Sequence, residues 1–395
     1  MGPRGGTAVR TLWAGTGSSD AVHSYRAGAE AAAAATDGRS GAVLFLFVPA
    51  DRDLVSLVAG ARSVVGATPI VGCTTAGEIA APRAGSVGVV AFAVGGDAVA
   101  VRTAAAHGAS ADLRAAGVRV AEEVLSTVPG GGRQLLLLLS DGLAGDQQEL
   151  LRGAYSVAEG AIPLVGGCAG DDLRMRRTRQ IHGDDVLTDA VVAVGLTLEG
   201  PVGIGVGHGW TEVGEPMVVT ASSGTRVRAL DDQPALDAYL ERLRPPASAA
   251  ADAEAFARFA QTHPLGLQRR AGVSIRFIAG ADFDSRELVC LAQVPEGGLA
   301  YLMRGDERSI LDGADQACRE ALAQLGGVPP AGMLAFDCIA RRGVLGAAGV
   351  LEEARRLSAG AGGAPVAGFY TYGEFARTHG MSGFHNQTLV VVAFG

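Results

Sequence analysis

The sequence predicts an α/β protein whose mixed sheets are built from repeated strand-helix-strand-loop-strand units and which divides into two domains. Two observations support this fold class. A short Gly motif occurs twice in the same spacing, and each copy lies in a longer stretch where apolar runs alternate with segments of helical period. The length of 395 residues exceeds what one hydrophobic core usually serves, so two domains are expected.

The motif has the pattern P-x-x-G-x-x-T-x-G-E. One copy, "PIVGCTTAGEI", begins at Pro69, and the other, "PVAGFYTYGEF", begins at Pro365. A third stretch from Pro163, "PLVGGCAGDD", keeps the Pro and the first Gly but has neither the Thr nor the Glu. Because all three stretches share the Pro and the first Gly, we predict an architectural role for these two residues. The Thr and the Glu stay open to function.

The three stretches belong to larger units of the same order. Each unit has an apolar run, a stretch of helical period, the Gly motif, a loop and a second apolar run. The first runs begin at Ala42, Gln134 and Met333, and the second runs begin at Val87, Ala190 and Thr388. Long apolar runs suit strands that are covered on both faces, and a strand after a crossover helix suits parallel pairing.

A connector separates two of the units from the third. The stretch "RPPASAAADAEAFARFA" from Arg244 combines a Pro pair with Ala and Ser and then becomes helical, which is typical of an inter-domain connector or an exposed insertion. We therefore expect an N-terminal domain over residues 1–230 with two units. The C-terminal domain is expected over residues 231–395 with the third unit.

Composition excludes several classes of function. A net charge of -8 and a pI near 5.4 argue against a nucleic-acid partner, which needs clustered basic charge. The chain has no lysine, so a Schiff-base enzyme and a P-loop are excluded. Five scattered cysteines suit a reducing compartment, and no apolar run reaches the roughly 18 residues of a membrane helix. We expect a cytoplasmic protein without membrane insertion.

The residues around the repeated motif resemble the FIST family of intracellular signal-transduction sensors. The resemblance rests on both motif copies, on "FDCIAR" from Phe336 and on "FHNQTLVV" from Phe384, and it covers nearly the whole chain. It implies FIST N-terminal and C-terminal domains that bind a small molecule and act on a separate signalling protein. One branch of the family binds haem and reports nitric oxide to histidine kinases.

The C-terminal motif carries the first set of candidate ligand-binding residues. Arg341, at the end of the preceding strand, and Glu374 could hold the two charges of a zwitterion. Between them lie Phe369, Tyr370, Thr371 and Tyr372, which we predict to form an aromatic wall with polar tips, as in small-ligand pockets. His385 and Asn386 precede the final strand, which should lie beside the motif.

The N-terminal motif supplies the second set. Cys73, Thr74, Thr75 and Glu78 occupy the corresponding positions, and we expect them either to be scaffold or to form the second wall of a cleft between the domains. Their side chains are smaller than those of the C-terminal copy, so ligand chemistry is expected mainly in the C-terminal unit.

The predicted function is a sensor for an amino-acid-like metabolite that signals to a partner such as a histidine kinase. No cofactor is certain. One alternative is a gas sensor with non-covalent haem, whose iron ligand would be His385 or His208. A second alternative is a metal-assisted hydrolase in which Asp141, Asp171 and Asp172 converge on one cation. We favour structural roles for these three carboxylates, as helix caps and turn residues.

Overall fold

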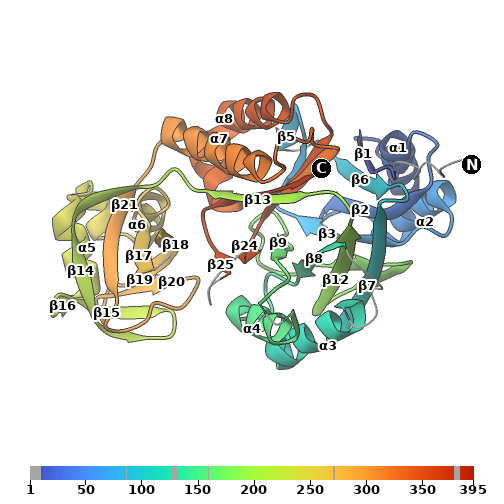
Figure 1. The fold of residues 1–395 in the computed structure, drawn as a ribbon. Helices are drawn as coiled ribbons and strands as arrows, with labels where there is room; N and C mark the ends of the chain where they lie inside the picture. The colour runs from blue at the N-terminus through green and yellow to red at the C-terminus, as the bar shows by residue number, and fades with distance from the viewer. Residues whose placement is uncertain (1–9, 86, 126–131, 159, 270–271, 378–382) are drawn as a thin grey trace, which may run out of the picture.

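The computed structural model describes residues 10–85, 87–125, 132–158, 160–269, 272–377 and 383–395 (Figure 1). Residues 1–9 lie outside these ranges. The predicted fold class is confirmed, because the chain is α/β, has mixed sheets and forms two domains. A body of three repeat units carries an insertion over residues 211–304.

The three repeat units share one order of elements: strand, helix, strand, helix, strand, hairpin, strand. Unit one consists of β1 (Trp13–Ser19), α1 (Ser24–Thr36), β2 (Gly41–Pro49), α2 (Leu54–Val65), β3 (Ile70–Thr75), β4 (Glu78–Ala80), β5 (Arg83–Gly85) and β6 (Val89–Gly95). Unit two consists of β7 (Val99–His107), α3 (Leu113–Leu125), β8 (Arg133–Ser140), α4 (Gln147–Ala158), β9 (Leu164–Cys168), β10 (Gln180–His182), β11 (Asp185–Leu187) and β12 (Ala190–Leu198).

Unit three repeats this order, with the insertion placed after its first strand. Its elements are β13 (Val202–Gly207), α7 (Glu307–Ala323), β22 (Gly332–Cys338), α8 (Ile339–Gly360), β23 (Val366–Thr371), β24 (Glu374–Arg377), β25 (Phe384–His385) and β26 (Leu389–Phe394). Since β13 pairs with β26, the third unit begins before residue 230. The domain limits at residues 230 and 231 stay a prediction.

Each unit builds four strands of a sheet in the same way. The strand orders are β1-β6-β2-β3, β7-β12-β8-β9 and β13-β26-β22-β23. The second and third long strands of each unit pair in parallel, because a helix crosses over between them. The other pairings in these sheets are antiparallel, so each sheet is mixed.

The hairpins are exchanged between the units and complete the sheets. Hairpin β4-β5 of unit one pairs with β23 of unit three, β10-β11 of unit two pairs with β3, and β24-β25 of unit three pairs with β9. Each six-stranded sheet therefore has four strands from one unit and two from another. Because every unit gives one hairpin and receives one, the exchange closes the three units into a ring.

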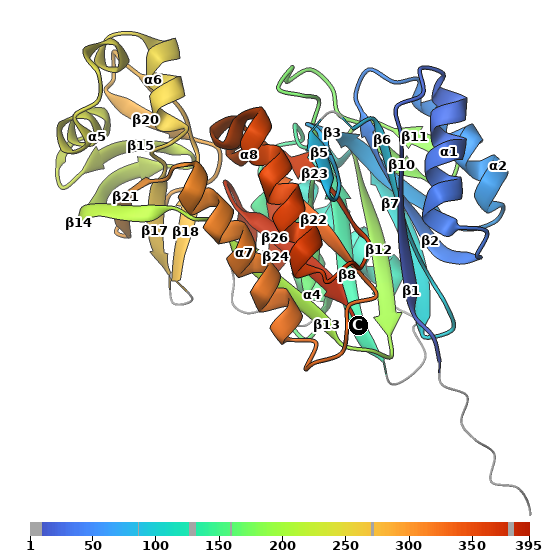
Figure 2. The ribbon, with the colours of Figure 1, turned by 90° about the horizontal axis from the view of Figure 1, so that it is seen from above.

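The ring surrounds one apolar core. Side chains from the inner faces of all three sheets form a single buried cluster, which includes Phe47, Phe92, Leu137, Val192 and Phe336. The helices cover the outer faces of their own sheets, as α7 and α8 do over unit three in Figure 2. The apolar runs of the sequence are strands covered on both faces, as their composition predicts.

The first motif glycine has the same place in every unit. Gly72, Gly166 and Gly368 lie on the third strand and pair with the middle of the second strand. A Cβ atom at any of the three would lie 1.8 to 2.1 Å from a backbone carbonyl oxygen of that second strand. Only glycine fits so close an approach of two chains. The predicted duplication is therefore a structural repeat.

The insertion is a separate layer structure with its own core. Its elements are β14 (Thr211–Ser223), β15 (Arg226–Leu230), β16 (Gln233–Pro234), α5 (Ala235–Leu243), α6 (Ala253–Ala260), β17 (Leu265–Arg269), β18 (Gly272–Arg276), β19 (Ile278–Asp282), β20 (Glu287–Cys290) and β21 (Leu299–Arg304). All its strand pairings are antiparallel, and it lies at one end of the body beside α7 (Figures 1 and 2). None of the helices in the described ranges is long and apolar enough to cross a membrane.

Candidate functional site

The Thr-x-Gly-Glu half of the motif forms a tight turn in unit one. Thr75 Oγ1 donates a hydrogen bond to Glu78 Oε1 at 2.5 Å and accepts one from the backbone N–H of Gly77 at 3.2 Å. Gly77 has a φ of 120°, which favours glycine. The turn leads from β3 directly into β4, which leaves its own sheet and pairs with unit three. Thr75 and Glu78 therefore have a structural role whatever they bind.

Unit three has the same turn, but there its threonine and glutamate are fully buried, and we call it the sealed turn. Thr371 Oγ1 donates to Glu374 Oε1 at 2.6 Å, and the N–H of Gly373 donates to Thr371 at 3.1 Å. The second carboxylate oxygen of Glu374 accepts from the hydroxyl and the N–H of Thr388, at 2.7 and 3.2 Å. Glu374 is fully buried, and this burial raises its pKa to about 7, although the hydrogen bonds oppose the rise.

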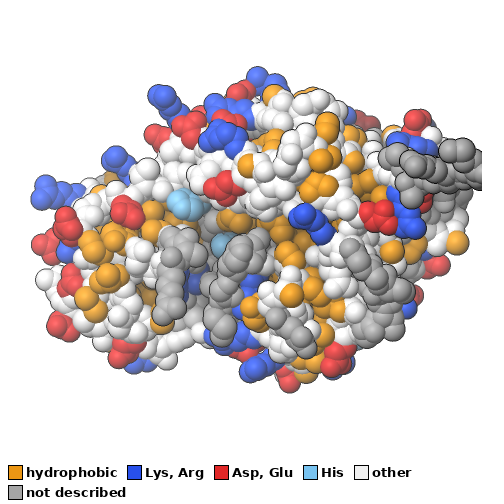
Figure 3. Space-filling view, viewed as in Figure 1, with side chains coloured by type: hydrophobic (Ala, Val, Ile, Leu, Met, Phe, Trp, Pro, Cys, Tyr) orange, Lys and Arg blue, Asp and Glu red, His pale blue; other side chains and the backbone are white. Residues whose placement is uncertain are grey.

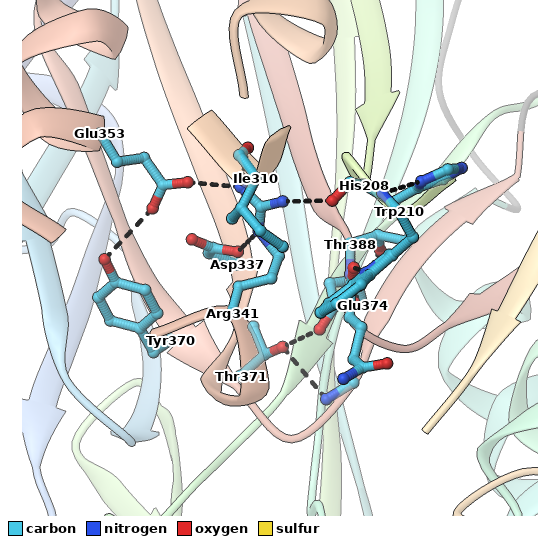
Figure 4. A network of polar contacts seen from close by, with 12 residues as sticks. His208, Trp210, Ile310, Asp337, Arg341, Glu353, Tyr370, Thr371, Glu374 and Thr388 are labelled. Atoms are coloured by element: carbon cyan, nitrogen blue, oxygen red, sulfur yellow. Dashed lines mark hydrogen bonds and ion pairs between the residues drawn. The ribbon is translucent and has the colours of Figure 1, made fainter. Parts of the chain in front are cut away.

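Arg341 pairs with two other carboxylates and not with Glu374, and its predicted role in ligand binding stays a prediction. The guanidinium is fully buried and binds the carboxylates of Asp337 at 2.6 Å and Glu353 at 2.5 Å (Figure 4). It also donates to the carbonyl of His208 at 2.9 Å. The reason is helical geometry: Arg341 lies in the first turn of α8, four residues after Asp337, and so faces α7 and α8 instead of the motif turn.

The structure does not bring the residues of the predicted aromatic wall to one surface, because they lie along a strand. Successive side chains of β23 point to opposite faces. Phe369 faces the central core, with its ring 4.8 Å from that of Phe47. Tyr370 faces α8, where its hydroxyl contacts Glu353 at 3.4 Å. Tyr372 lies beyond the strand and reaches unit two, so the three rings share no common surface.

The remaining residues of the N-terminal set are covered by unit two. Cys73 is buried and pairs with Gln180 of the exchanged hairpin. Thr74 is also buried, and its hydroxyl accepts a hydrogen bond from the N–H of Arg179 at 3.0 Å. Neither side chain lines the cavity described below, so the structure brings Thr75 and Glu78 together without them.

Each of the two histidines proposed as haem ligands has one ring nitrogen in a hydrogen bond. His385 Nε2 contacts the carbonyl of Ala376 at 3.0 Å, and His208 Nδ1 accepts from the N–H of Trp210 at 3.0 Å. Burial lowers the pKa of each imidazole to about 4, so both are neutral. Iron coordination through these nitrogens would break the contacts. The other ring nitrogen of each histidine has no such contact among the described residues, and the haem alternative stays a prediction.

Asn386 is buried next to His385 in the loop before β26. Both polar atoms of its side chain lack a hydrogen-bond partner among the described residues. Asn386 therefore neither lines the cavity described below nor has a side-chain partner among the described residues. Its predicted role in ligand binding stays a prediction.

The three aspartates of the hydrolase alternative are held apart. Asp141 accepts from Thr178, Asp171 accepts from three backbone N–H groups, and Asp172 pairs with Arg342 at 3.0 Å. Within the described ranges, no group of three or more His, Cys, Asp or Glu side chains could hold a metal ion. The contacts are those of turn and loop residues, in agreement with the structural roles that we favour for them.

A cavity of about 530 Å³ lies beside the motif turn of unit one. It is placed beyond the carboxyl ends of β2 and β3, where α/β folds commonly bind ligands. The start of α8 and the loop between β9 and β10 complete it. Its lining residues are Asp20, Val22, Ser24, Pro49, Ala50, Asp51, Arg52, Asp53, Thr75, Gly77, Glu78, Gly88, Asp172, Arg174 and Arg342. All three units thus contribute to one polar cavity.

Glu78 is the most buried acidic group of this cavity, with 2% of its surface exposed. Burial raises its pKa to about 8, against the hydrogen bond from Thr75 and the positive charge of Arg342. At neutral pH the carboxyl group is therefore mostly protonated. Arg342 donates to the carbonyl of Ala76 at 2.5 Å and lies 5.7 Å from the ring centre of Tyr370.

Sequence reasoning found part of this cavity and missed its cations. The sequence predicts Thr75 and Glu78 as ligand-binding residues. It also predicts Arg341, whereas the arginine that lines the cavity is its neighbour Arg342. Consecutive residues of a helix point about 100° apart, so the choice between them needs the packing of α8. Arg52 and Arg174 lie in loops of units one and two, and no spacing in the sequence connects them with the motif.

The corresponding crevices of the other two units are filled. In unit two, Asp141 follows β8 and binds the hydroxyl of Thr178 at 2.7 Å. In unit three, Trp210 Nε1 donates to the carbonyl of Gln387 at 2.9 Å, and Gln387 Nε2 donates to the carbonyl of Gln261 in the insertion at 2.8 Å. A crevice that is open in unit one is thus closed by a loop in unit two and by the insertion in unit three.

Comparison with known proteins agrees with the repeated motif. The profile of the FIST N domain matches residues 42–233, and that of the FIST C domain matches residues 235–377. An uncharacterised protein of Mycobacterium tuberculosis is 28% identical over 238 residues, which is 58% of this chain and 60% of that protein. An uncharacterised protein of Mycobacterium bovis is 28% identical over 271 residues, 66% of this chain and 68% of the relative. The first match thus spans about three fifths of the relative's length.

Proposed function

Because the chain belongs to the FIST family, whose domains are associated with small-ligand sensing and signal transduction, we propose that it is a sensor whose ligand binds in the cavity beside Glu78. The ligand is an amino-acid-like metabolite with one ammonium and one carboxylate group. The partner is a separate signalling protein, such as a histidine kinase, in the cytoplasm. This places the ligand next to the N-terminal motif, with a contribution from the C-terminal unit through Arg342.

The main support is that Glu78 and Arg342 both line one cavity of ligand size. A buried carboxyl group with a single hydrogen-bond partner, Thr75, can take up an ammonium group. The guanidinium of Arg342 can take up a carboxylate, and Arg52 and Arg174 add positive charge nearby. A carboxyl group that can ionise and a guanidinium at two places in the cavity are what a zwitterion requires.

Ligand binding should change the protonation state of Glu78. The carboxyl group is mostly protonated at neutral pH because it is buried, and an ammonium group beside it favours the carboxylate. Binding should therefore release a proton from Glu78. A neutral or purely anionic ligand would not have this effect.

The same contacts suggest how occupancy is transmitted. Arg342 now holds Asp172, which belongs to the loop between β9 and β10. A ligand carboxylate would compete with Asp172 for the guanidinium. The ligand then favours the arrangement in which the loop is released, and the population of that arrangement rises with occupancy.

The test is calorimetric titration of the protein with a panel of amino acids, simple amines and simple carboxylates. We expect a zwitterion to bind, with Glu78→Gln and Arg342→Met each weakening it about tenfold or more. Titration in buffers of different ionisation enthalpy should show proton release at pH 7, and Glu78→Gln should abolish it.

The matched control is Glu374→Gln, which changes the same turn at its sealed position in unit three. It should leave affinity for the ligand within about twofold. If Glu78→Gln and Arg342→Met bind a zwitterion as the wild type does, or if none of the panel binds, the assignment of this cavity is wrong.

A further inference from the structure

The loop between β9 and β10 distinguishes unit two from the other units. Units one and three connect the corresponding strands with two residues, 76–77 and 372–373, whereas unit two uses residues 169–179. The added residues include "RMRRTR", with four arginines at positions 174, 176, 177 and 179, in a chain of net charge -8. On the face shown in Figure 3, acidic and basic side chains are interspersed.

The loop is held in one shape. The carboxylate of Asp171 accepts hydrogen bonds from the backbone N–H groups of Met175, Arg176 and Arg177, at 2.9, 2.8 and 3.0 Å. The hydroxyl of Tyr372 in unit three donates to the same carboxylate at 2.5 Å. Such a network fixes the backbone, so the side chains that point outward are presented in a fixed pattern.

The backbone of the loop is also unusual. Asp172, Leu173 and Met175 have φ angles of 55°, 61° and 51°, in the left-handed region that residues other than glycine rarely adopt. The N–H of Leu173 donates to the hydroxyl of Tyr372 at 2.7 Å, which holds this conformation. Strained backbone that the surroundings stabilise is concentrated at functional positions.

The outward side chains combine positive charge with apolar surface. Leu173 and Met175 are 59% and 56% exposed. Arg176 and Arg177 are exposed, and among the described residues their guanidinium groups form no ion pair. A large exposed apolar pair next to two unpaired arginines is typical of a protein-binding surface, where Met and Arg are enriched.

We propose that this loop is a docking surface for a partner protein, and that it binds a segment in which acidic and apolar residues alternate. The arginines attract the acidic residues of the segment and raise its association rate, and Leu173 and Met175 contact its apolar residues. A nucleic-acid partner is disfavoured, because Asp20, Asp51 and Asp172 at the neighbouring cavity would repel a phosphate backbone. The surface goes beyond the ligand site, and its test needs no ligand.

The experiment measures fluorescence anisotropy of a labelled short peptide of Glu, Leu and Ser with the full chain. Arg176→Glu with Arg177→Glu should weaken binding about tenfold or more, and added salt should weaken the wild-type complex. The control, Arg114→Glu with Arg308→Glu, makes the same charge change at exposed arginines outside the loop and should stay within about twofold.

A second pair of variants separates a protein segment from a simple anion. Leu173→Ala with Met175→Ala should weaken binding of the Glu, Leu and Ser peptide about fivefold and leave binding of a Glu and Ser peptide unchanged. Equal effects of the loop and control arginine pairs, or no effect of the apolar pair, would overturn the proposal. So would binding of duplex DNA or anionic vesicles that depends on Arg176 and Arg177 to the same extent.

Discussion

Units one and three carry the same turn, but one borders a cavity and the other is sealed. Glu78 and Glu374 are each held by the threonine three residues before them. In unit one, β1 is followed within five residues by α1, and the crevice stays open. In unit three, Trp210 and the insertion follow β13 and cover it. The motif builds the turn, and the segment inserted beside it decides whether the turn can meet a ligand.

The two adjacent arginines of α8 show the same difference between a buried site and an open one. Arg341 completes a buried network in unit three, whereas Arg342 reaches the cavity of unit one, with 25% of its side chain exposed. One helix turn thus serves stability on one side and the candidate ligand site on the other.

The largest expected effect is that of Arg341→Met. The substitution leaves Asp337 and Glu353 buried without their cation, so we expect a loss of about 3–5 kcal/mol in the free energy of unfolding. Urea denaturation measures it. Arg342→Met is the matched change and should cost less than about 1 kcal/mol, since its ion pair is partly exposed. Equal losses would contradict the comparison.

The glycines should behave alike in the two units. Gly72→Ala and Gly368→Ala each place a Cβ atom against a carbonyl oxygen, and we expect each to lower the free energy of unfolding by about 3 kcal/mol. Gly280→Ala in the insertion has open space and should stay within about 0.5 kcal/mol. A tolerated substitution at only one of the two motif positions would show that the repeat is not architectural there.

The two glutamates should differ in their pH dependence. Their pKa values are raised in the folded protein, to about 8 for Glu78 and about 7 for Glu374, so the folded state holds protons that the unfolded state loses above its pKa of 4.5. Their contribution to stability is full below the unfolded pKa and is lost as the pH rises through the folded one, at up to about 1.4 kcal/mol per pH unit for each group.

Variants isolate these contributions. The stability of Glu374→Gln relative to the wild type should rise with pH up to about 7, and that of Glu78→Gln should continue to rise up to about 8. Urea denaturation at a series of pH values measures both. A flat difference between pH 5 and 8 for Glu78→Gln would mean that its carboxyl group is ionised throughout.

The smallest effect should come from the threonines. Thr371→Val leaves one oxygen of a fully buried Glu374 without its donor, with an expected cost of about 2 kcal/mol. Thr75→Val should cost about half as much, because water in the cavity can replace the hydroxyl at Glu78. Thermal unfolding of the two variants side by side ranks their losses of stability. A larger loss for Thr75→Val than for Thr371→Val would place the sealed turn in unit one.

The fold could largely be predicted from local patterns. The apolar runs, the crossover helices and the Gly motif each depend on a short stretch of chain, and they predicted three repeat units with parallel strand pairs. The hairpin exchange could not be predicted, because β4 pairs with β23 nearly three hundred residues away and no local pattern records its partner. The limits of the two domains stay a prediction.

The candidate site was less predictable than the fold. Of the predicted ligand residues, Thr75 and Glu78 line the cavity, and most of the others are buried in the sheets or in the network around Arg341. The sequence shows which residue types repeat. It does not show which of the two motif copies is buried by a distant segment of the chain and which stays open to a cavity.

The sequence by itself determined the repeat, its glycines and the turn in which a threonine holds a glutamate, because close packing of adjacent strands and short-range hydrogen bonds depend on neighbours in the chain. Tertiary structure alone decided that Arg342 and not Arg341 faces the cavity, and that Glu78 and not Glu374 borders it. The physical reason is burial. Whether a carboxyl group lies in a cavity or under a cover depends on which distant segments pack over it, here the insertion in unit three and an open crevice in unit one.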